Sequence, residues 1–250
     1  MSDIAKTEQA PVAEERSDAG SPAPADVARP GAAQSQSAQR IARHGLADRL
    51  FHWLNAAVTL TLVATSFLPV AGIRFDWIMI HWIAGLVLTG LVLFHIVRAL
   101  GWQDRRAMGL GRADLKGAVQ GLRWGARLSR QPPAPPGKYP LPQKLFHHGM
   151  ALVILVAIGT GLLMLLKIDT PFWGRDPYIL SGYAWGIVYV LHGLSAMAVL
   201  AMVVVHIYFA VRPEKLWITR SMIAGWITRK EYEDHFDPKL WRAGSDSDGS

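Results

Sequence analysis

Four apolar stretches, each long enough to cross a lipid bilayer, determine what this chain can fold into. They cover residues 50–70, 77–97, 145–166 and 184–211, and a membrane-spanning helix needs only about 20 residues. Because lipid offers no hydrogen-bond partner to a bare backbone, spans of this kind form helices that pack into a bundle. The sequence therefore predicts an all-α integral membrane protein built on a four-helix bundle.

Basic residues between the spans predict which end of the bundle faces the cytoplasm. The connection over residues 98–144 holds ten Lys or Arg and two acids, and such loops stay on the cytoplasmic side. Further basic residues precede the first span and follow the last one. We therefore expect both termini in the cytoplasm, whereas the two short, nearly neutral connections should face the exterior.

Composition excludes several classes of function. The net charge of +7 resides in loops beside the spans, where membrane orientation and anionic headgroups account for it, so no nucleic acid partner is expected. The chain has no cysteine, which excludes disulfides, cysteine-ligated iron–sulfur clusters and covalent c-type haem. Any haem on this chain is therefore held noncovalently.

The chain divides into three predicted regions. Residues 1–38, rich in Ala, Pro and Ser, are predicted to form a disordered cytoplasmic tail. Residues 39–213 carry the four-helix domain, and residues 214–250 form a cytoplasmic amphipathic helix and tail, either an interfacial anchor or a platform for a partner. The stretch 112–130 is either a basic helix on the membrane surface or a solvated connector.

Histidines occur at two depths in the predicted helices. His81 and His192 lie near the outer face, whereas His52, His95 and His206 lie near the inner one. Fourteen residues separate His192 from His206, which is about 21 Å of rise and nearly four turns, so both project from one side of their helix. Ionisable groups inside membranes are usually functional, and haem iron takes two imidazoles from facing helices.

Two stacked haem sites follow from these depths. His81 and His192 form the predicted outer pair, while His52 and His95 both remain candidates to face His206 in the inner one. Glycines near the histidines, Gly85, Gly90 and Gly193, leave room for a flat cofactor. The alternative is that these are neutral histidines bonded across helices.

Several segments of the chain resemble a known family. They are DRLFHWLNA, IMIHWIAG, GKYPLPQK, the LHG and VHIYFA histidines, and SMIAGWITRKEYEDHFDPKLW. It is the cytochrome b (gamma) subunit of respiratory membrane-bound formate dehydrogenases, a dihaem four-helix family related to Ni/Fe-hydrogenase cytochromes b. The resemblance covers residues 43 to about 241. It implies two haem b groups, one held by His81 and His192 and the other by His52 and His206, and it alone prefers His52 to His95.

The resemblance also implies a role in electron transfer. An iron–sulfur subunit, joined to a catalytic dehydrogenase subunit, would pass electrons through the two haems to quinone in a bacterial inner membrane. The quinone pocket of the family corresponds here to Tyr139, Gln143 and Lys144, with prolines at two other motif positions. The chain would then be an electron-transfer subunit of a formate dehydrogenase rather than its catalytic chain.

Other functions remain open. The same haem module could serve another quinone-linked oxidoreductase, such as a hydrogenase or a thiosulfate reductase. A haem-free membrane anchor is an alternative from a different class. A transporter is disfavoured, because no Asp or Glu lies inside the four predicted spans.

Overall fold

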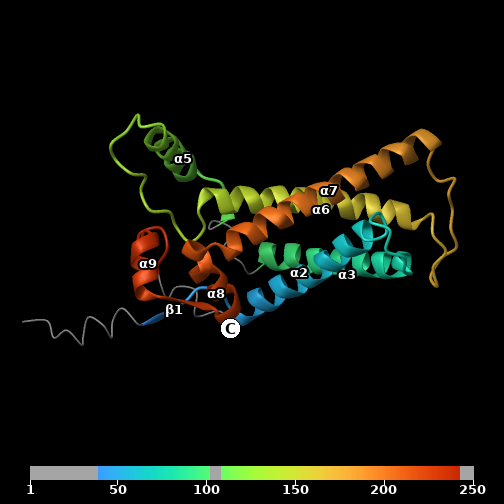
Figure 1. The fold of residues 1–250 in the computed structure, drawn as a ribbon, viewed down its shortest axis with the longest axis horizontal. Coiled ribbons are helices and arrows are strands. Elements are labelled where there is room, and N and C mark those ends of the chain that lie inside the picture. The colour runs from blue at the N-terminus through green and yellow to red at the C-terminus, as the bar shows by residue number, and fades with distance from the viewer. Residues whose placement is uncertain (1–38, 102–107, 243–250) are drawn as a thin grey trace, which may run out of the picture.

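Four long helices run side by side in the structure, a computed structural model that describes residues 39–101 and 108–242 (Figure 1). Each has the length and composition to cross a membrane. They are α2 (Leu46–Phe67), α3 (Trp77–Gly101), α6 (Leu141–Leu165) and α7 (Gly182–Val211). The predicted all-α membrane bundle is thereby confirmed, with helix bounds close to the predicted ones. The tail predicted for residues 1–38 lies outside the described residues.

The long helices form two hairpins. Helix α2 packs along α3, and α6 packs along α7, while contacts between α3 and α6 and between α2 and α7 close the ring. The helices touch more extensively within a hairpin than between hairpins. The interior between the two hairpins is consequently the place where the bundle has room for something other than its own side chains.

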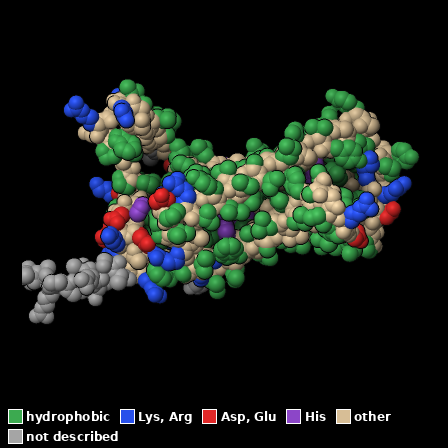
Figure 2. All heavy atoms as spheres, in the orientation of Figure 1, with side chains coloured by type: hydrophobic (Ala, Val, Ile, Leu, Met, Phe, Trp, Pro, Cys, Tyr) green, Lys and Arg blue, Asp and Glu red, His purple; other side chains and the backbone are tan. Residues whose placement is uncertain are grey.

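Apolar side chains cover the outside of the bundle, and charged side chains gather at its two ends (Figure 2). On α3, for example, Leu93, Phe94 and Val97 are each more than half exposed. A soluble protein rarely exposes so large an apolar surface, whereas hydrocarbon surrounds it readily. The distribution is that of a bundle with its long axis across a membrane.

A shorter helix, α5 (Arg112–Gly125), lies beside the start of α6 and apart from the bundle (Figure 1). The stretch that begins at residue 112 is therefore helical, and the helix ends at Gly125. Its first turn is capped by the Asp114 carboxylate, which accepts a hydrogen bond from the Gly111 amide at 2.9 Å. The proline-rich segment that follows leads into α6, whose first turn includes Pro142, where a missing amide proton costs nothing.

The C-terminal segment is not the single amphipathic helix that the sequence predicts. It forms η1 (Pro213–Lys215), α8 (Leu216–Ala224), β2 (Trp226–Thr228) and α9 (Arg229–His235). Helix α8 ends at Gly225, where φ is 88° and a Cβ would lie 3.0 Å from the His44 carbonyl oxygen. Strand β2 then pairs antiparallel with β1 (Arg40–Ala42), a strand too short for its residue pattern to reveal.

Residues 39–45 and 213–242 form a small unit that we call the terminal cap. Its core consists of Ile41, Ile227, Tyr232, Phe236 and Trp241. The Tyr232 hydroxyl donates a hydrogen bond to the Trp241 carbonyl. Both ends of the described chain therefore meet at one end of the bundle (Figure 1).

Arg43 is a buried charge inside the cap. Its guanidinium lies over the rings of Trp217 and Phe236, 5.3 and 5.1 Å from their centroids. Burial lowers the pKa of Arg43 to about 10, against a smaller opposing effect of Tyr139. The side chain therefore remains charged at neutral pH, held against aromatic faces that attract cations.

Hydrogen bonds join the cap to the two helices that enter it. Arg49 and Trp53 on α2 donate to the carbonyls of Ile223 and Met222 in α8, at 2.5 and 3.1 Å. Thr219 donates to the Ala210 carbonyl of α7 at 2.6 Å. The cap thus holds the start of α2 and the end of α7 in a fixed relation.

Replacing Ile227 by alanine should unfold the cap before the bundle. This side chain is fully buried, and such a truncation costs about 2–5 kcal/mol. Hydrogen exchange of residues 226–236 reports the loss. The matched control is Ile223→Ala, since Ile223 is 61% exposed and its truncation should change exchange little. Equal exchange in the two variants would show that the cap does not depend on this core.

Candidate functional site

His81 on α3 and His192 on α7 face one another inside the bundle. Their ring centroids are 6.2 Å apart and the ring planes are inclined at 79°. A metal–imidazole bond is about 2 Å long and the ring centre lies roughly 1 Å behind the nitrogen, so two rings on opposite sides of one metal ion have centroids roughly 6 Å apart. The pair therefore has the spacing of two axial ligands.

Two buried threonines hold these rings. The Thr65 hydroxyl lies 2.8 Å from His81 Nδ1 and the Thr160 hydroxyl lies 3.0 Å from His192 Nδ1. Each hydroxyl donates its own proton to a backbone carbonyl one turn earlier in its helix, so it accepts the N–H of the imidazole. The Nδ1 atoms therefore carry the protons, which leaves each Nε2 lone pair free for a metal.

A cavity of about 570 Å³ lies beside the outer pair, and side chains from all four long helices line it. Its volume is within the usual range of cofactor sites, about 300–1,000 Å³. A Cβ at Gly85 or Gly193 would meet nothing within 4 Å, whereas one at Gly161 would come within 3.3 Å of His192 Cε1. Gly161 thus makes room for the imidazole, and Gly85 and Gly193 border free space. Apart from the two histidines the lining is almost entirely apolar, as suits a flat macrocycle.

His52 on α2, and not His95 on α3, lies opposite His206 on α7. The centroids of His52 and His206 are 6.2 Å apart, the same separation as in the outer pair. The His95 ring stacks on Phe51 at 4.9 Å and faces His147 of α6 at 6.0 Å. The structure therefore distinguishes the two inner candidates that residue depth alone leaves equivalent.

The inner pair also has an unsatisfied polar atom. His52 Nδ1 is buried with no hydrogen-bond partner in the described structure, and an unpaired buried group costs about 1–3 kcal/mol. A metal ion bound at Nδ1 would offset that cost, whereas one bound at Nε2 would leave Nδ1 unpaired. His95 Nδ1 is equally unpaired, but its neighbour is His147 rather than His206. The residues at both depths therefore fit a bis-imidazole haem, more completely at the outer pair, where a cavity is also present.

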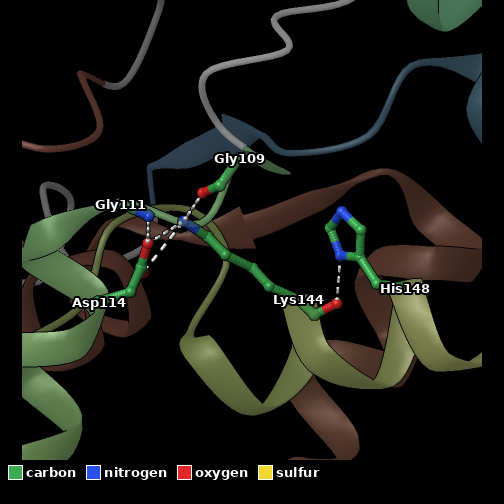
Figure 3. A network of polar contacts seen from close by, with 5 residues as sticks. All are labelled: Gly109, Gly111, Asp114, Lys144 and His148. Carbon is green, nitrogen blue, oxygen red and sulfur yellow. Dashed lines mark hydrogen bonds and ion pairs between the residues drawn. The ribbon is translucent and has the colours of Figure 1, made fainter.

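The ammonium group of Lys144 is engaged by two neighbouring residues. Its Nζ lies 3.0 Å from both carboxylate oxygens of Asp114 and donates to the Gly109 carbonyl at 2.9 Å (Figure 3). These acceptors occupy the three protons of the ammonium group, and only 7% of the residue is exposed. The role that the structure shows for Lys144 is to tether α5 to the first turn of α6. Tyr139 and Gln143, also expected near a quinone, lie half-buried beside it.

Breaking this tether should release α5 from the bundle. Lys144→Met leaves the Asp114 carboxylate without its cation. Because 18% of the Asp114 side chain is exposed, the cost should be smaller than the roughly 3–5 kcal/mol of a fully buried pair. Hydrogen exchange over residues 112–125 should then accelerate, whereas Gln120→Ala, at an exposed position of α5, should leave it unchanged. Unchanged exchange in Lys144→Met would show that other contacts hold α5.

The same tether should withstand mild acid. Burial tends to raise the pKa of Asp114, but the hydrogen bond from the Gly111 amide and the ion pair with Lys144 outweigh it, so the pKa is lowered. A lowered carboxyl pKa gives stability that is fully present above the unfolded value of about 3.9 and is lost as the pH falls through the folded value. Release of α5 above pH 5 in the exchange experiment would contradict this assignment.

Comparison with known proteins gives two results. Residues 43–225 match the family described as Prokaryotic cytochrome b561, a range that includes all four long helices and both histidine pairs. The chain is also similar to a Bradyrhizobium diazoefficiens protein named "Probable Ni/Fe-hydrogenase B-type cytochrome subunit". The two are 30% identical over 206 residues, which cover 71% of this chain and 81% of that protein.

Proposed function

This chain belongs to the prokaryotic cytochrome b561 family. We therefore propose that it is the b-type cytochrome subunit of a membrane oxidoreductase and carries electrons between a partner enzyme and quinone. Family membership implies a b-type haem. The observation that supports the proposal best is the presence of two facing imidazole pairs, each with centroids 6.2 Å apart. A haem-free anchor would have no use for such pairs.

Each histidine has a role in this proposal. His81 and His192 hold the outer haem, and His52 and His206 hold the inner one, so the chain carries two haem b groups. Haem b supplies reversible one-electron transfer when bound. Thr65 and Thr160 fix the outer imidazoles in the tautomer that leaves Nε2 free, and the apolar cavity wall keeps water away from the ligands.

The threonine hydroxyls should matter for haem binding. Thr65→Val keeps the side-chain volume but removes the acceptor of the His81 Nδ1 proton, and loss of such an outer contact typically weakens metal binding 10- to 100-fold. Haem transfer to an excess of apomyoglobin measures the effect. Thr61→Val is the control, because the Thr61 hydroxyl bonds to the Ala57 carbonyl of its own helix. Equal haem loss in both variants would contradict the role of Thr65.

The membrane orientation is part of the proposal. The end that carries the cap and α5 faces the cytoplasm of a bacterial inner membrane, because the basic connection between α3 and α6 lies there. His81 and His192 are then near the outer surface. Alkaline phosphatase fused after residue 242 should be inactive and green fluorescent protein fused there should fluoresce; the reverse result would invert the orientation.

A quinone would bind near the inner pair. Tyr139 and Gln143 lie where α6 begins, at the same end of the bundle as His52 and His206, and both side chains can donate a hydrogen bond to a quinone carbonyl. Lys144 is already engaged by Asp114, so it serves the pocket only by holding the α6 entrance in place.

The similarity to a Ni/Fe-hydrogenase cytochrome favours a hydrogenase as the partner enzyme, with an iron–sulfur subunit as the direct donor. The resemblance of short motifs to formate dehydrogenase cytochromes favours formate dehydrogenase instead. Anoxic membrane vesicles containing the chain and its native partners separate the two. We expect hydrogen to reduce the b-type absorption bands; reduction by formate and not by hydrogen would assign the chain to a formate dehydrogenase. Reduction by dithionite alone would contradict both partners.

A further inference from the structure

Helix α5 carries an apolar stripe that nothing in the described part of the chain covers. Leu115, Val119 and Leu122 follow the spacing i, i+4, i+7 and therefore share one face of the helix. They are 66%, 46% and 74% exposed, and Leu128, just beyond the helix, is 72% exposed. An exposed stripe of this kind needs an apolar environment.

A row of basic residues runs along one edge of this stripe. Arg112, Lys116 and Arg123 follow the spacing i, i+4, i+11, so at 3.6 residues per turn they too share a face. Around the helix axis, each of these basic residues lies less than 90° from the nearest residue of the apolar stripe. The acid of the helix, Asp114, is already paired with Lys144. The charge available along the stripe is therefore positive.

The end of α5 adds further donors for an anion. Arg127 adopts a left-handed conformation with φ of 59°, and the chain leaves the helix there. A shallow pocket is lined by Trp124, Arg127, Ser129 and Arg130. Guanidinium and hydroxyl groups are the donors that most often bind phosphate oxygens.

The tether places this helix at the level where a membrane surface would lie. Lys144, in the first turn of the spanning helix α6, holds Asp114 in the first turn of α5 (Figure 3). Helix α5 itself is displaced sideways from the bundle at that level (Figure 1). Beside the point where a span enters the bilayer, the neighbouring substance is lipid headgroup.

We propose that α5 lies on the bilayer surface and binds anionic phospholipid. Leu115, Val119 and Leu122 insert at the boundary with the acyl chains, and the basic row contacts the headgroup phosphates. The interaction fixes the connection between the two hairpins on the cytoplasmic side, and it does not depend on the haem assignment.

A single spin label can test this proposal, because the chain has no cysteine of its own and Leu122→Cys gives one thiol. The full chain is placed in nanodiscs that contain phosphatidylglycerol and phosphatidylcholine. We expect a nitroxide at position 122 to collide more with lipid-soluble oxygen than with a water-soluble nickel chelate. The matched label, Gln120→Cys, lies 200° round the helix and should show the reverse preference. Equal access of the chelate to both labels would overturn the proposal.

The charge requirement is tested in the same system. The preference for oxygen at position 122 should fall when Arg112, Lys116 and Arg123 are changed to glutamine, or when the nanodiscs contain phosphatidylcholine alone. Each charge removed should lower the ratio of bilayer-bound to unbound α5 by roughly fivefold. An unchanged preference would overturn the role of anionic lipid. Protection of the label that appears only when a partner subunit is added would assign the stripe to a protein instead. Circular dichroism of each variant confirms that the helices remain folded.

Discussion

Replacing His192 by alanine should remove the outer haem and leave the inner one, so that the haem content falls from about two to about one per chain. His192 is the α7 member of the outer pair, and His81 alone would leave the iron with one protein ligand. Apart from His81 and His192 the cavity lining is mostly apolar, and its two other potential haem ligands, the thioethers of Met164 and Met197, would change the spectrum of any haem that they held. Pyridine haemochrome assay against protein concentration measures the change.

The control for this variant is His235→Ala. His235 is exposed on α9 of the cap, where it contacts the Trp217 ring, and its removal should leave the haem content unchanged. Retention of both haems in His192→Ala, with the spectrum of the unmodified protein, would contradict the assignment of His192 as a ligand.

Three alanine variants should separate the inner ligands. Replacement of His206 or His52 should each remove the inner haem, because their rings face one another at 6.2 Å. Replacement of His95 should preserve it, since the His95 ring lies against Phe51 and His147. The effect expected of the first two variants is again the loss of one haem per chain.

Redox titration is the second readout for these variants. The haem that remains in His206→Ala and in His52→Ala should titrate as a single component with the same midpoint potential in both, since it is the outer haem in each case. Loss of a haem in His95→Ala with both haems kept in His52→Ala would reverse the inner assignment.

The sequence predicted those features that depend on local chemistry. Apolar runs of about 20 residues favour membrane helices, and the four long helices of the structure agree with the four predicted spans. The depth of each histidine follows from helix rise alone, which is why His81 and His192 were expected to pair. Their facing positions in the structure agree with that expectation; their ligation of haem is still a prediction.

Other features depend on which helices become neighbours, and no periodicity encodes that. His52 faces His206 because α2 lies against α7, and the cap holds both helix ends through Arg49 and Thr219. In the sequence Thr65 and Thr160 are polar residues inside apolar spans, a signal that can identify candidates for orienting an imidazole. It cannot say which histidine each one meets.

Lys144 shows a different limit of motif reasoning. Its place in a motif suggests a quinone contact, which stays a prediction, and does not reveal that its ammonium group pairs with Asp114, thirty residues earlier in the chain. The strands of the cap were missed for a related reason. Three residues are too few to show an alternating pattern, and β1 pairs with a segment almost at the other end of the chain.

The binding of haem iron at two depths, by imidazoles from neighbouring transmembrane helices, is the proposal on which the other roles depend. Its most direct test is the haem stoichiometry of the unmodified protein, purified after expression with ample haem supply, together with its dithionite-reduced absorption spectrum. We predict about two noncovalent haem b per chain with the bands of bis-imidazole iron. A folded preparation, with its four helices intact by circular dichroism and no Soret band, would contradict the claim.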